Sequence, residues 1–257
     1  MKTKSLGFIG GGRVTRILLQ AFANKTTKFH SIIVYDINPD VLAALCKQFP
    51  DIELAETPAQ AAWQSIVIIA LHPPVIMECL NKIVDSITTD SVVVSLAPKI
   101  TIEKIATKLK TANIARMIPN ATSFINEGYN PITFASNFLE SERANLLDVL
   151  DVLGHNFETV ESKLEAYAMI SAMLPTYFWF QWNELEKLGT QMGLTDMESR
   201  RSIRDTMAAA INLMYDSELE PEQVKDLIPV KPIGDSEAQI LELYQTKLLG
   251  LFRKITP

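Results

Sequence analysis

The chain has 257 residues, 47% of them hydrophobic, which is enough for one large or two modest domains with a substantial core. A formal net charge of −6 without a basic patch argues against a nucleic-acid partner. The two cysteines and three histidines share no metal-ligand spacing, and no run approaches the roughly twenty apolar residues of a membrane helix, so we expect a cytoplasmic globular protein without a metal or a membrane anchor.

The first predicted strand, 6–9, runs into three consecutive glycines and then an apolar-faced helix over 13–20. This order is typical of a dinucleotide site. Gly10 permits a tight turn, Gly12 lets the backbone approach a pyrophosphate, and the helix start at Arg13 and Val14 offers free N–H groups to that anion. The alternative is a glycine turn that binds no cofactor, and it stays open because Thr15 stands where glycine or alanine is usual.

A second predicted strand, 31–35, leads to Asp36, about twenty residues beyond the glycines, as the dinucleotide pattern requires. A carboxylate at this strand end accepts hydrogen bonds from the ribose hydroxyls and repels a 2′-phosphate, which favours NAD over NADP. Two alternatives stay open. Asp36 can cap the next helix together with Asn38 and Pro39, and Arg13 is a nearby cation that can serve NADP.

The remaining strands alternate with helical patterns, which is typical of a parallel sheet with crossover helices and hence of an α/β domain. We predict them at 52–54, 66–71, 92–96, 114–117, 132–135 and 157–160. The run at 66–71 is apolar without alternation, as in a central strand covered on both faces. Before it, Thr57 and Pro58 predict the start of a short helix, with a hydroxyl cap and a proline at its first position.

Candidate site residues follow the ends of these strands, where sheets of this kind bind ligands. His72 would face a nicotinamide, and Asn120 would hydrogen-bond cofactor or substrate; the alternatives are a loop histidine and an asparagine that satisfies its own turn. A turn is expected at 127–128. The residues predicted to bind the cofactor are Gly10, Gly12, Arg13, Val14, Asp36, Leu71, His72, Pro73, Ala97 and Asn120.

After residue 160 the β-branched clusters end and apolar residues recur at helical spacing. We therefore place a Rossmann-type domain at 1–160 and an all-helical domain at 161–257. Pro175 should break the helical pattern near Leu174, and further helices are expected over 196–216 and 236–253. Such a thin helical tail has little core of its own, so we expect a homodimer, or a higher oligomer, through this half.

Several motifs, in order and spacing along nearly the whole chain, resemble those of the pyrroline-5-carboxylate reductase family. The run GFIGGG at 7–12 resembles the family's opening, and RMIPN at 116–120, followed by EG at 127–128, resembles its R-x-M-P-N segment and E-G pair. Glu161 stands at the expected distance before SAMLPTY at 171–177, which is similar to the family's S-G-S-G-P-A-Y helix.

The resemblance implies a Rossmann domain followed by an intertwined helical dimerisation domain. It also implies NAD(P)H-dependent reduction of a cyclic imine, pyrroline-5-carboxylate to L-proline, and thus a place in proline and amino-acid biosynthesis. Ser236 is then the expected donor to the imine nitrogen and Asn120 the residue that orients the cofactor, which makes these two the predicted catalytic residues. Lys231, Gly234 and Ser236 are expected to contact the acid group of the substrate.

The segment KPIGDS at 231–236 departs from the family's S-P-G-G-T-T loop, which holds the substrate carboxylate. Ile233 adds a bulky side chain where glycine lets the backbone approach an anion, and Asp235 adds a negative charge that Lys231 can offset. Three hypotheses stay open. They are the family's imine reduction, an NAD(P)-dependent oxidoreductase with another small substrate, and a non-catalytic dimeric nucleotide-binding protein.

Overall fold

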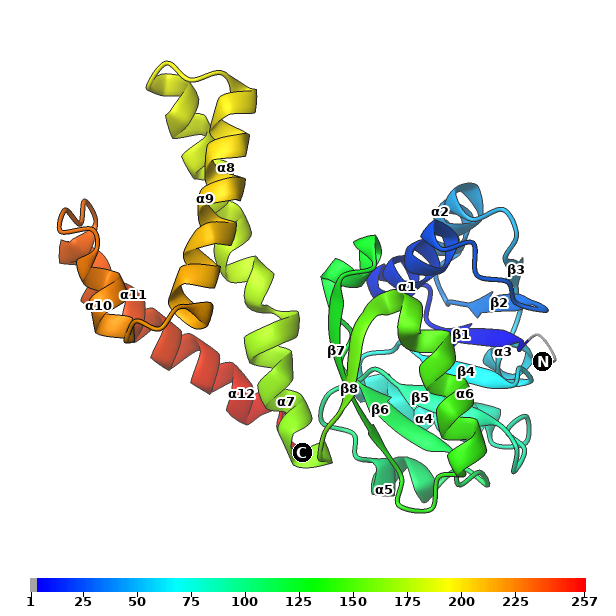
Figure 1. Cartoon of the computed structure of the whole chain (residues 1–257). Coiled ribbons are helices and arrows are strands. Elements are labelled where there is room, and N and C mark those ends of the chain that lie inside the picture. The colour runs from blue at the N-terminus through cyan, green and yellow to red at the C-terminus, as the bar shows by residue number, and fades with distance from the viewer. Residues whose placement is uncertain (1–3) are drawn as a thin grey trace. The chain divides into compact units, whose positions relative to one another are not determined.

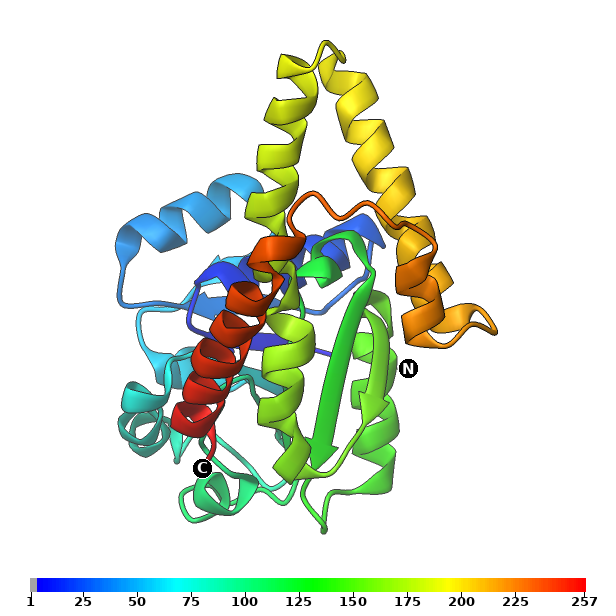
Figure 2. The ribbon, with the colours of Figure 1, turned by 90° about the vertical axis from the view of Figure 1, so that its left-hand side faces the viewer.

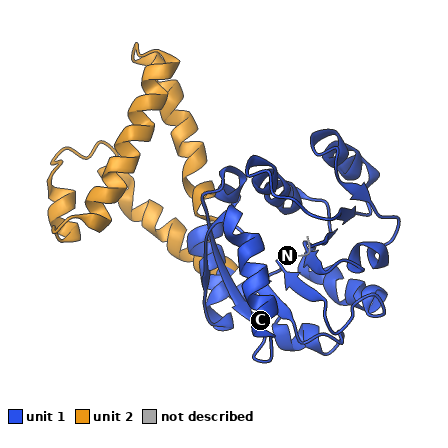
Figure 3. Ribbon diagram, turned by 45° about the vertical axis from the view of Figure 1, so that its right-hand side comes forward, with its two compact units in different colours: residues 1–172, 252–257 blue, residues 173–251 orange. Residues whose placement is uncertain are grey.

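The computed structural model describes residues 4–257, which divide into two compact units: residues 4–172 with 252–257, and residues 173–251 (Figure 3). The first unit carries the sheet and the second is helical, so the predicted fold class is confirmed. Within residues 4–257, no helix combines the length and the apolar character needed to span a membrane. The domain boundary between 160 and 161 stays a prediction.

Unit 1 is built on an eight-stranded sheet in the order β3-β2-β1-β4-β5-β6-β7-β8 (Figure 1). The strands are β1 (Leu6–Ile9), β2 (Ile32–Tyr35), β3 (Glu53–Leu54), β4 (Ile66–Ile69), β5 (Val92–Ser95), β6 (Ile114–Met117), β7 (Gly128–Phe134) and β8 (Gly154–Glu158). Each predicted strand is present, and β4 lies in the centre of the order, as its unbroken apolar run indicates.

One part of the sheet differs from the prediction. β7 pairs antiparallel with β6, whereas a wholly parallel sheet was expected. The chain between these strands holds only the 3₁₀ turn Ala121–Ile125, which is too short for the crossover of a dozen or more residues that parallel pairing requires. Gly128, which we expected in a turn, is the first residue of β7.

Helices cover both faces of the sheet. Alternate side chains of β1, β4 and β5 point to opposite faces of the sheet and belong to two separate cores. The first core lies under α1 (Arg13–Asn24), α2 (Pro39–Gln48) and α6 (Glu140–Leu150). The second lies under α3 (Pro58–Ala62), α4 (Pro73–Ile83) and α5 (Ile102–Ala106). In β1, for example, Phe8 belongs to the first core and Ile9 to the second. The predicted cap of α3 is confirmed, because the Thr57 hydroxyl accepts the Gln60 N–H.

After β8, a short 3₁₀ helix, Glu161–Lys163, leads into α7 (Leu164–Tyr167), which passes into a π-helical segment, Ala168–Ala172. Pro175 lies in the first turn of the next helix, α8 (Leu174–Gln191), so the predicted interruption near Leu174 is confirmed. A longer helix, α9 (Asp196–Asp216), has the bounds expected from its pattern, and α10 (Pro221–Asp226) follows as a short helix that we did not predict. The last predicted helix is present as α11 (Glu237–Leu243) and α12 (Leu249–Ile255), joined by the π-helical segment Tyr244–Leu248.

Unit 2 is open, and its main feature is the antiparallel pair α8 and α9 (Figures 1 and 2). The two helices approach closely where Gly189 meets Ser199, since a Cβ at Gly189 would overlap the serine hydroxyl. Ser199 is the single buried residue among 173–251, and large apolar side chains such as Met192, Tyr215 and Ile228 are exposed. Unit 2 therefore has no core of its own, as the sequence predicts.

Gly7 tests how closely α3 packs on the sheet. A Cβ at this buried position in β1 would overlap the carbonyl oxygen of Ala61, a backbone atom that cannot move aside cheaply. We expect Gly7→Ala to lower the free energy of unfolding by about 3 kcal/mol, measured by urea denaturation. The control is Gly12→Ala, where a Cβ meets nothing within 4 Å; its change should stay within about 0.5 kcal/mol. Equal stability of the two variants would contradict the packing argument.

Candidate functional site

The glycine turn after β1 is tight on one side and open on the other. Gly10 has φ 103°, a left-handed conformation that favours glycine, and a Cβ there would overlap the carbonyl oxygen of Ala70. Gly12 caps α1 without a side chain, and the space around its Cβ position is empty out to 4 Å. The free N–H groups of α1 thus face a space large enough for an anion to approach the backbone.

Asp36 braces this turn. Its carboxylate accepts the Gly11 N–H at 2.7 Å and the Asn38 N–H at 2.8 Å, one on each oxygen. The cap of α2 is Asn38, whose side chain accepts the Asp40 N–H, so the capping role considered for Asp36 belongs to its neighbour. Each Asp36 oxygen keeps acceptor capacity for a ribose hydroxyl, because an ionised carboxylate offers about four lone-pair sites.

Thr15, where the dinucleotide pattern usually has glycine or alanine, has a structural role in the same turn. Its buried hydroxyl donates to the Gly10 carbonyl at 2.5 Å. The hydroxyl therefore satisfies a polar group that the tight turn leaves inside the protein. The departure at this position is compatible with an anion-binding turn.

A cavity of about 720 Å³ opens next to the turn at the carboxyl edge of the sheet. Six of the predicted cofactor residues line it: Gly12, Arg13, Val14, Leu71, His72 and Pro73. Its other walls come from α2 and from Leu96 and Pro98 after β5. His72 caps α4 without a side-chain hydrogen bond, which leaves its imidazole available to a ligand.

Arg13 and Arg16 both line this cavity, and only Arg13 was predicted from the sequence. Arg13 and Arg16 are exposed, and within residues 4–257 neither has a carboxylate partner. Cations in the first turn oppose the positive end of the helix dipole, so the pair is unfavourable for α1 alone. A bound phosphate compensates both the dipole and the guanidinium charges. The spacing of the two arginines, one helical turn apart, was the available signal for Arg16.

The structure does not bring Asn120 into this cavity. Its side-chain oxygen accepts from the N–H and the hydroxyl of Thr122 at 3.0 and 2.9 Å, and its amide donates to the carbonyl and hydroxyl of Ser171 at 3.3 and 3.2 Å. Asn120 thus satisfies its own turn and ties it to the π-helical segment. Its predicted role in orienting the cofactor stays a prediction.

A buried ion cluster lies behind the cavity wall. Arg116 in β6 donates to Glu161 at 2.9 Å and to Glu165 at 2.6 Å, and its side chain is 1% exposed. The same guanidinium donates to the carbonyl of Ala97 at 3.2 Å, so Ala97, a predicted cofactor residue, is a buried anchor rather than part of the lining. A lone arginine in the apolar strand at 114–117 was the signal that buried carboxylates must exist.

The predicted substrate residues lie in unit 2, on an exposed turn. Gly234–Ser236 forms a 3₁₀ turn in which the Gly234 N–H donates to the Lys231 carbonyl and the Ser236 N–H to the Ile233 carbonyl, both at 3.0 Å. Ile233 is 71% exposed, and Lys231, Asp235 and Ser236 are exposed as well. The turn therefore presents a hydroxyl, a cation, an anion and an apolar group side by side.

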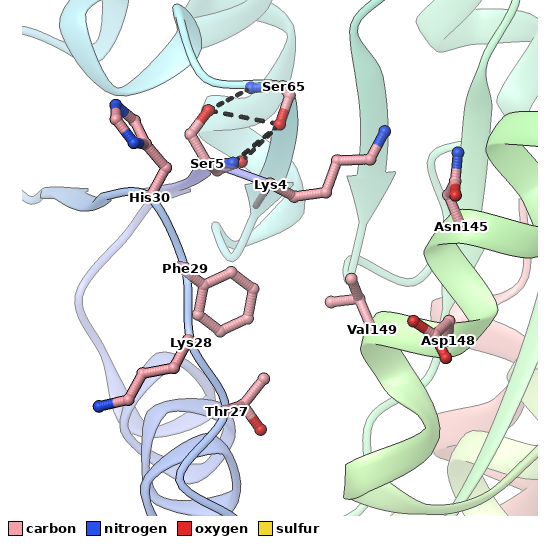
Figure 4. A pocket seen from close by; sticks show the side chains of 10 residues that line it. All are labelled: Lys4, Ser5, Thr27, Lys28, Phe29, His30, Ser65, Asn145, Asp148 and Val149. Atoms are coloured by element: carbon pink, nitrogen blue, oxygen red, sulfur yellow. Dashed lines mark hydrogen bonds between the residues drawn. The ribbon is translucent and has the colours of Figure 1, made fainter. Parts of the chain in front are cut away.

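A second cavity of about 660 Å³ lies at the opposite, amino edge of the sheet (Figure 4). It opens between the segment before β2 and helix α6, where Phe29 points toward Val149 and Lys28 points away (Figure 4). Ser5 and Ser65 hydrogen-bond to each other there, and Lys4 pairs with Glu142 at 3.0 Å. No predicted site residue lines this cavity.

Known proteins resemble the chain over both units. Residues 5–99 match the family model described as NADP oxidoreductase coenzyme F420-dependent, and residues 161–256 match the one described as pyrroline-5-carboxylate reductase dimerisation. The pyrroline-5-carboxylate reductase of Escherichia coli (strain K12) is 24% identical over 228 residues, 88% of this chain and 84% of the relative. That of Corynebacterium melassecola is 22% identical over 253 residues, 96% and 93% of the two chains. The solved pyrroline carboxylate reductase of Plasmodium falciparum with NADP bound has a similar fold, with a TM-score of 0.76, 20% identity and coverage of 99% and 95%.

The fold, the open glycine turn and these matches define a dinucleotide-dependent oxidoreductase with a Rossmann-type domain and a helical dimerisation domain. Residues 5–99 and 161–256 carry the domains that these two family models describe, and the chain is similar to pyrroline-5-carboxylate reductases that match 88% and 96% of its length. The predicted cofactor class, NAD(P)H, is confirmed at this family level. The residues present also fit it, because the space at Gly12 is empty out to 4 Å and because Arg13 and Arg16, which have no carboxylate partner within residues 4–257, suit its phosphates.

Gly12→Ala tests the open side of the glycine turn. The added methyl group occupies the space through which the backbone approaches the pyrophosphate, so the dissociation constant of NADH and of NADPH should rise about tenfold. Fluorescence titration of the reduced cofactor measures this without any substrate. Gly250→Ala is the control, because its Cβ also meets nothing within 4 Å but lies in α12, far along the chain. Unchanged affinity in Gly12→Ala would contradict the assignment of the phosphate site.

Proposed function

We propose that this protein catalyses the NAD(P)H-dependent reduction of a cyclic imine, pyrroline-5-carboxylate, to L-proline. The observation that carries the proposal is that one chain contains both a turn suited to phosphate binding and a match to the pyrroline-5-carboxylate reductase dimerisation domain. Relatives named pyrroline-5-carboxylate reductase, which match 88% and 96% of the chain, support it.

In the proposed reaction the bound cofactor supplies a hydride to the C=N carbon of the substrate. The chain's own residues would position the cofactor and substrate and exclude water. Leu71, His72 and Pro98 would form the walls at the nicotinamide end of the cavity. Ser236 would donate a hydrogen bond to the imine nitrogen and pass it a proton as the hydride reaches the carbon, and solvent would return a proton to the hydroxyl. Lys231, with the Gly234 and Ser236 turn, would hold the acid group.

We further propose that the protein works as a homodimer. Unit 2 exposes large apolar side chains on several helices and buries a single serine, so it needs another surface to cover it. The match of residues 161–256 to a dimerisation domain supports a second copy of the chain as that surface.

For the cofactor we propose a preference for NADH over NADPH. The Asp36 carboxylate stands at the end of β2, where the adenosine ribose binds in this fold, and it repels a 2′-phosphate. Arg13 and Arg16 line the cavity next to the glycine turn and favour phosphate in general, so their charge supports binding of both forms.

The proposal predicts steady turnover of pyrroline-5-carboxylate with NADH, measured as loss of absorbance of the reduced cofactor beside a parallel assay with NADPH. Ser236→Ala should lower kcat/KM about 100-fold, since the loss removes a proton donor from the transition state, while cofactor affinity stays unchanged. Ser202→Ala, an exposed serine on α9, is the matched control. Absence of turnover by a protein that binds the cofactor would refute the proposed activity.

A specific observation supports a second candidate, an NAD(P)-dependent oxidoreductase that acts on a small substrate without a carboxylate. Ile233 projects from the 231–236 turn, and Asp235 adds a negative charge where the family loop holds an acid group. A cation or a neutral imine suits such a turn better than an anion. A third hypothesis, a nucleotide-binding protein without catalysis, has no observation in its favour beyond the same departures.

The double variant Ile233→Gly with Asp235→Thr separates the first two candidates. If the turn obstructs a carboxylate, removing the bulk and the charge should raise kcat/KM for pyrroline-5-carboxylate about tenfold, mainly through a lower KM. Lys225→Thr on α10, which changes a charge elsewhere in unit 2, is the control. Unchanged or poorer turnover in the double variant would mean that the turn is not the obstacle.

A further inference from the structure

The segment that follows β5 contains a backbone conformation that its residue type disfavours. Lys99 has φ 71°, in the left-handed region, although it is neither glycine nor asparagine. It follows Pro98, whose φ is fixed by its ring, and Pro98 lines the cofactor cavity. Strain of this kind persists only where the surroundings hold the backbone from several sides.

The surroundings of Lys99 are the buried ion cluster. The Lys99 N–H donates to Glu165 at 3.0 Å, and the same carboxylate oxygen accepts from Arg116 at 2.6 Å. Arg116 in turn donates to the Ala97 carbonyl at 3.2 Å. One ion pair therefore holds two backbone groups on either side of Pro98, the carbonyl before it and the N–H after it.

The cluster reaches the next helix as well. Glu161 accepts the Ile102 N–H at 2.7 Å, at the start of α5, and also pairs with Arg116. The Glu165 side chain is only 2% exposed and does not line the cavity. Its effect on a ligand must therefore pass through the backbone that it holds.

We propose that Glu165 is a positioning residue for the cofactor: it keeps the Pro98–Lys99 turn in its left-handed form and so fixes the cavity wall beside the nicotinamide end. The inference rests on the cofactor site of the proposed function, but not on the identity of the imine substrate. In Glu165→Gln the size of the side chain is kept and its charge is lost, so the bond to the Lys99 N–H weakens and the turn relaxes.

The test is a rescue, measured as the dissociation constant of NADH, and of NADPH in parallel, by fluorescence titration without substrate. Glu165→Gln should weaken binding about tenfold. Adding Lys99→Gly should restore affinity to within about threefold, because glycine adopts the left-handed conformation without strain. Lys99→Gly alone should change affinity less than about twofold. If the double variant binds as weakly as Glu165→Gln, the carboxylate serves only to balance the Arg116 charge, and the proposal is wrong.

Two further measurements still test the proposal if Glu165→Gln folds poorly. Lys99→Val keeps Glu165 and Arg116 but places a β-branched residue in the left-handed region, so it should also weaken cofactor binding; normal affinity in this variant would overturn the proposal. Amide hydrogen exchange of the peptide 96–102 reports the turn without any cofactor. Exchange should be faster in Glu165→Gln and in Lys99→Val than in the exposed control Glu103→Gln, and equal rates would likewise overturn it.

Discussion

The contact between Arg116 and its two glutamates is the interaction on which the organisation of unit 1 depends. A guanidinium in a buried apolar strand is very unfavourable unless carboxylates and carbonyls accept from it, and Glu161, Glu165 and Ala97 accept from its two terminal nitrogens. These groups belong to the helical segment after β8 and to the turn after β5. Satisfying one buried charge therefore fixes the position of the first helical turns beyond the sheet and of one wall of the cofactor cavity.

The carboxyl edge of the sheet combines this rigid wall with an open one. On the glycine side, Asp36 and Thr15 use their polar groups to hold the backbone of the turn, and no side chain fills the space at Gly12. Preorganisation of this kind lowers the entropy cost of binding a long, flexible cofactor. Arg13 and Arg16, which line the cavity and have no carboxylate partner within residues 4–257, then contribute positive charge.

Local patterns in the sequence predicted the elements of the fold well, because β-branched runs, the Thr57 cap and the helical periodicity at 196–216 act over a few residues. The glycine turn and the cavity-lining residues at 71–73 could be predicted from the sequence for the same reason. Contacts between distant segments were not: Glu161 and Glu165 are 45 and 49 residues from Arg116, and no spacing rule links them. The left-handed backbone of Lys99 also depends on tertiary packing rather than on residue preference, whereas the antiparallel direction of β7 follows from the short connection between β6 and β7.

The proposed cofactor site lies in unit 1 and the proposed substrate turn in unit 2, and this separation affects how substrate specificity can change. In unit 1 the cofactor side is fixed by buried polar groups, so a change there disturbs several elements at once. The 231–236 turn lies on an exposed segment of a unit that lacks a core, and Ile233 and Asp235 are free to differ without any effect on the sheet. Under the proposed function, the departures at this turn alter what would face the substrate and leave the glycine turn of unit 1 unchanged. A change of substrate within a retained reductase framework needs no more than that.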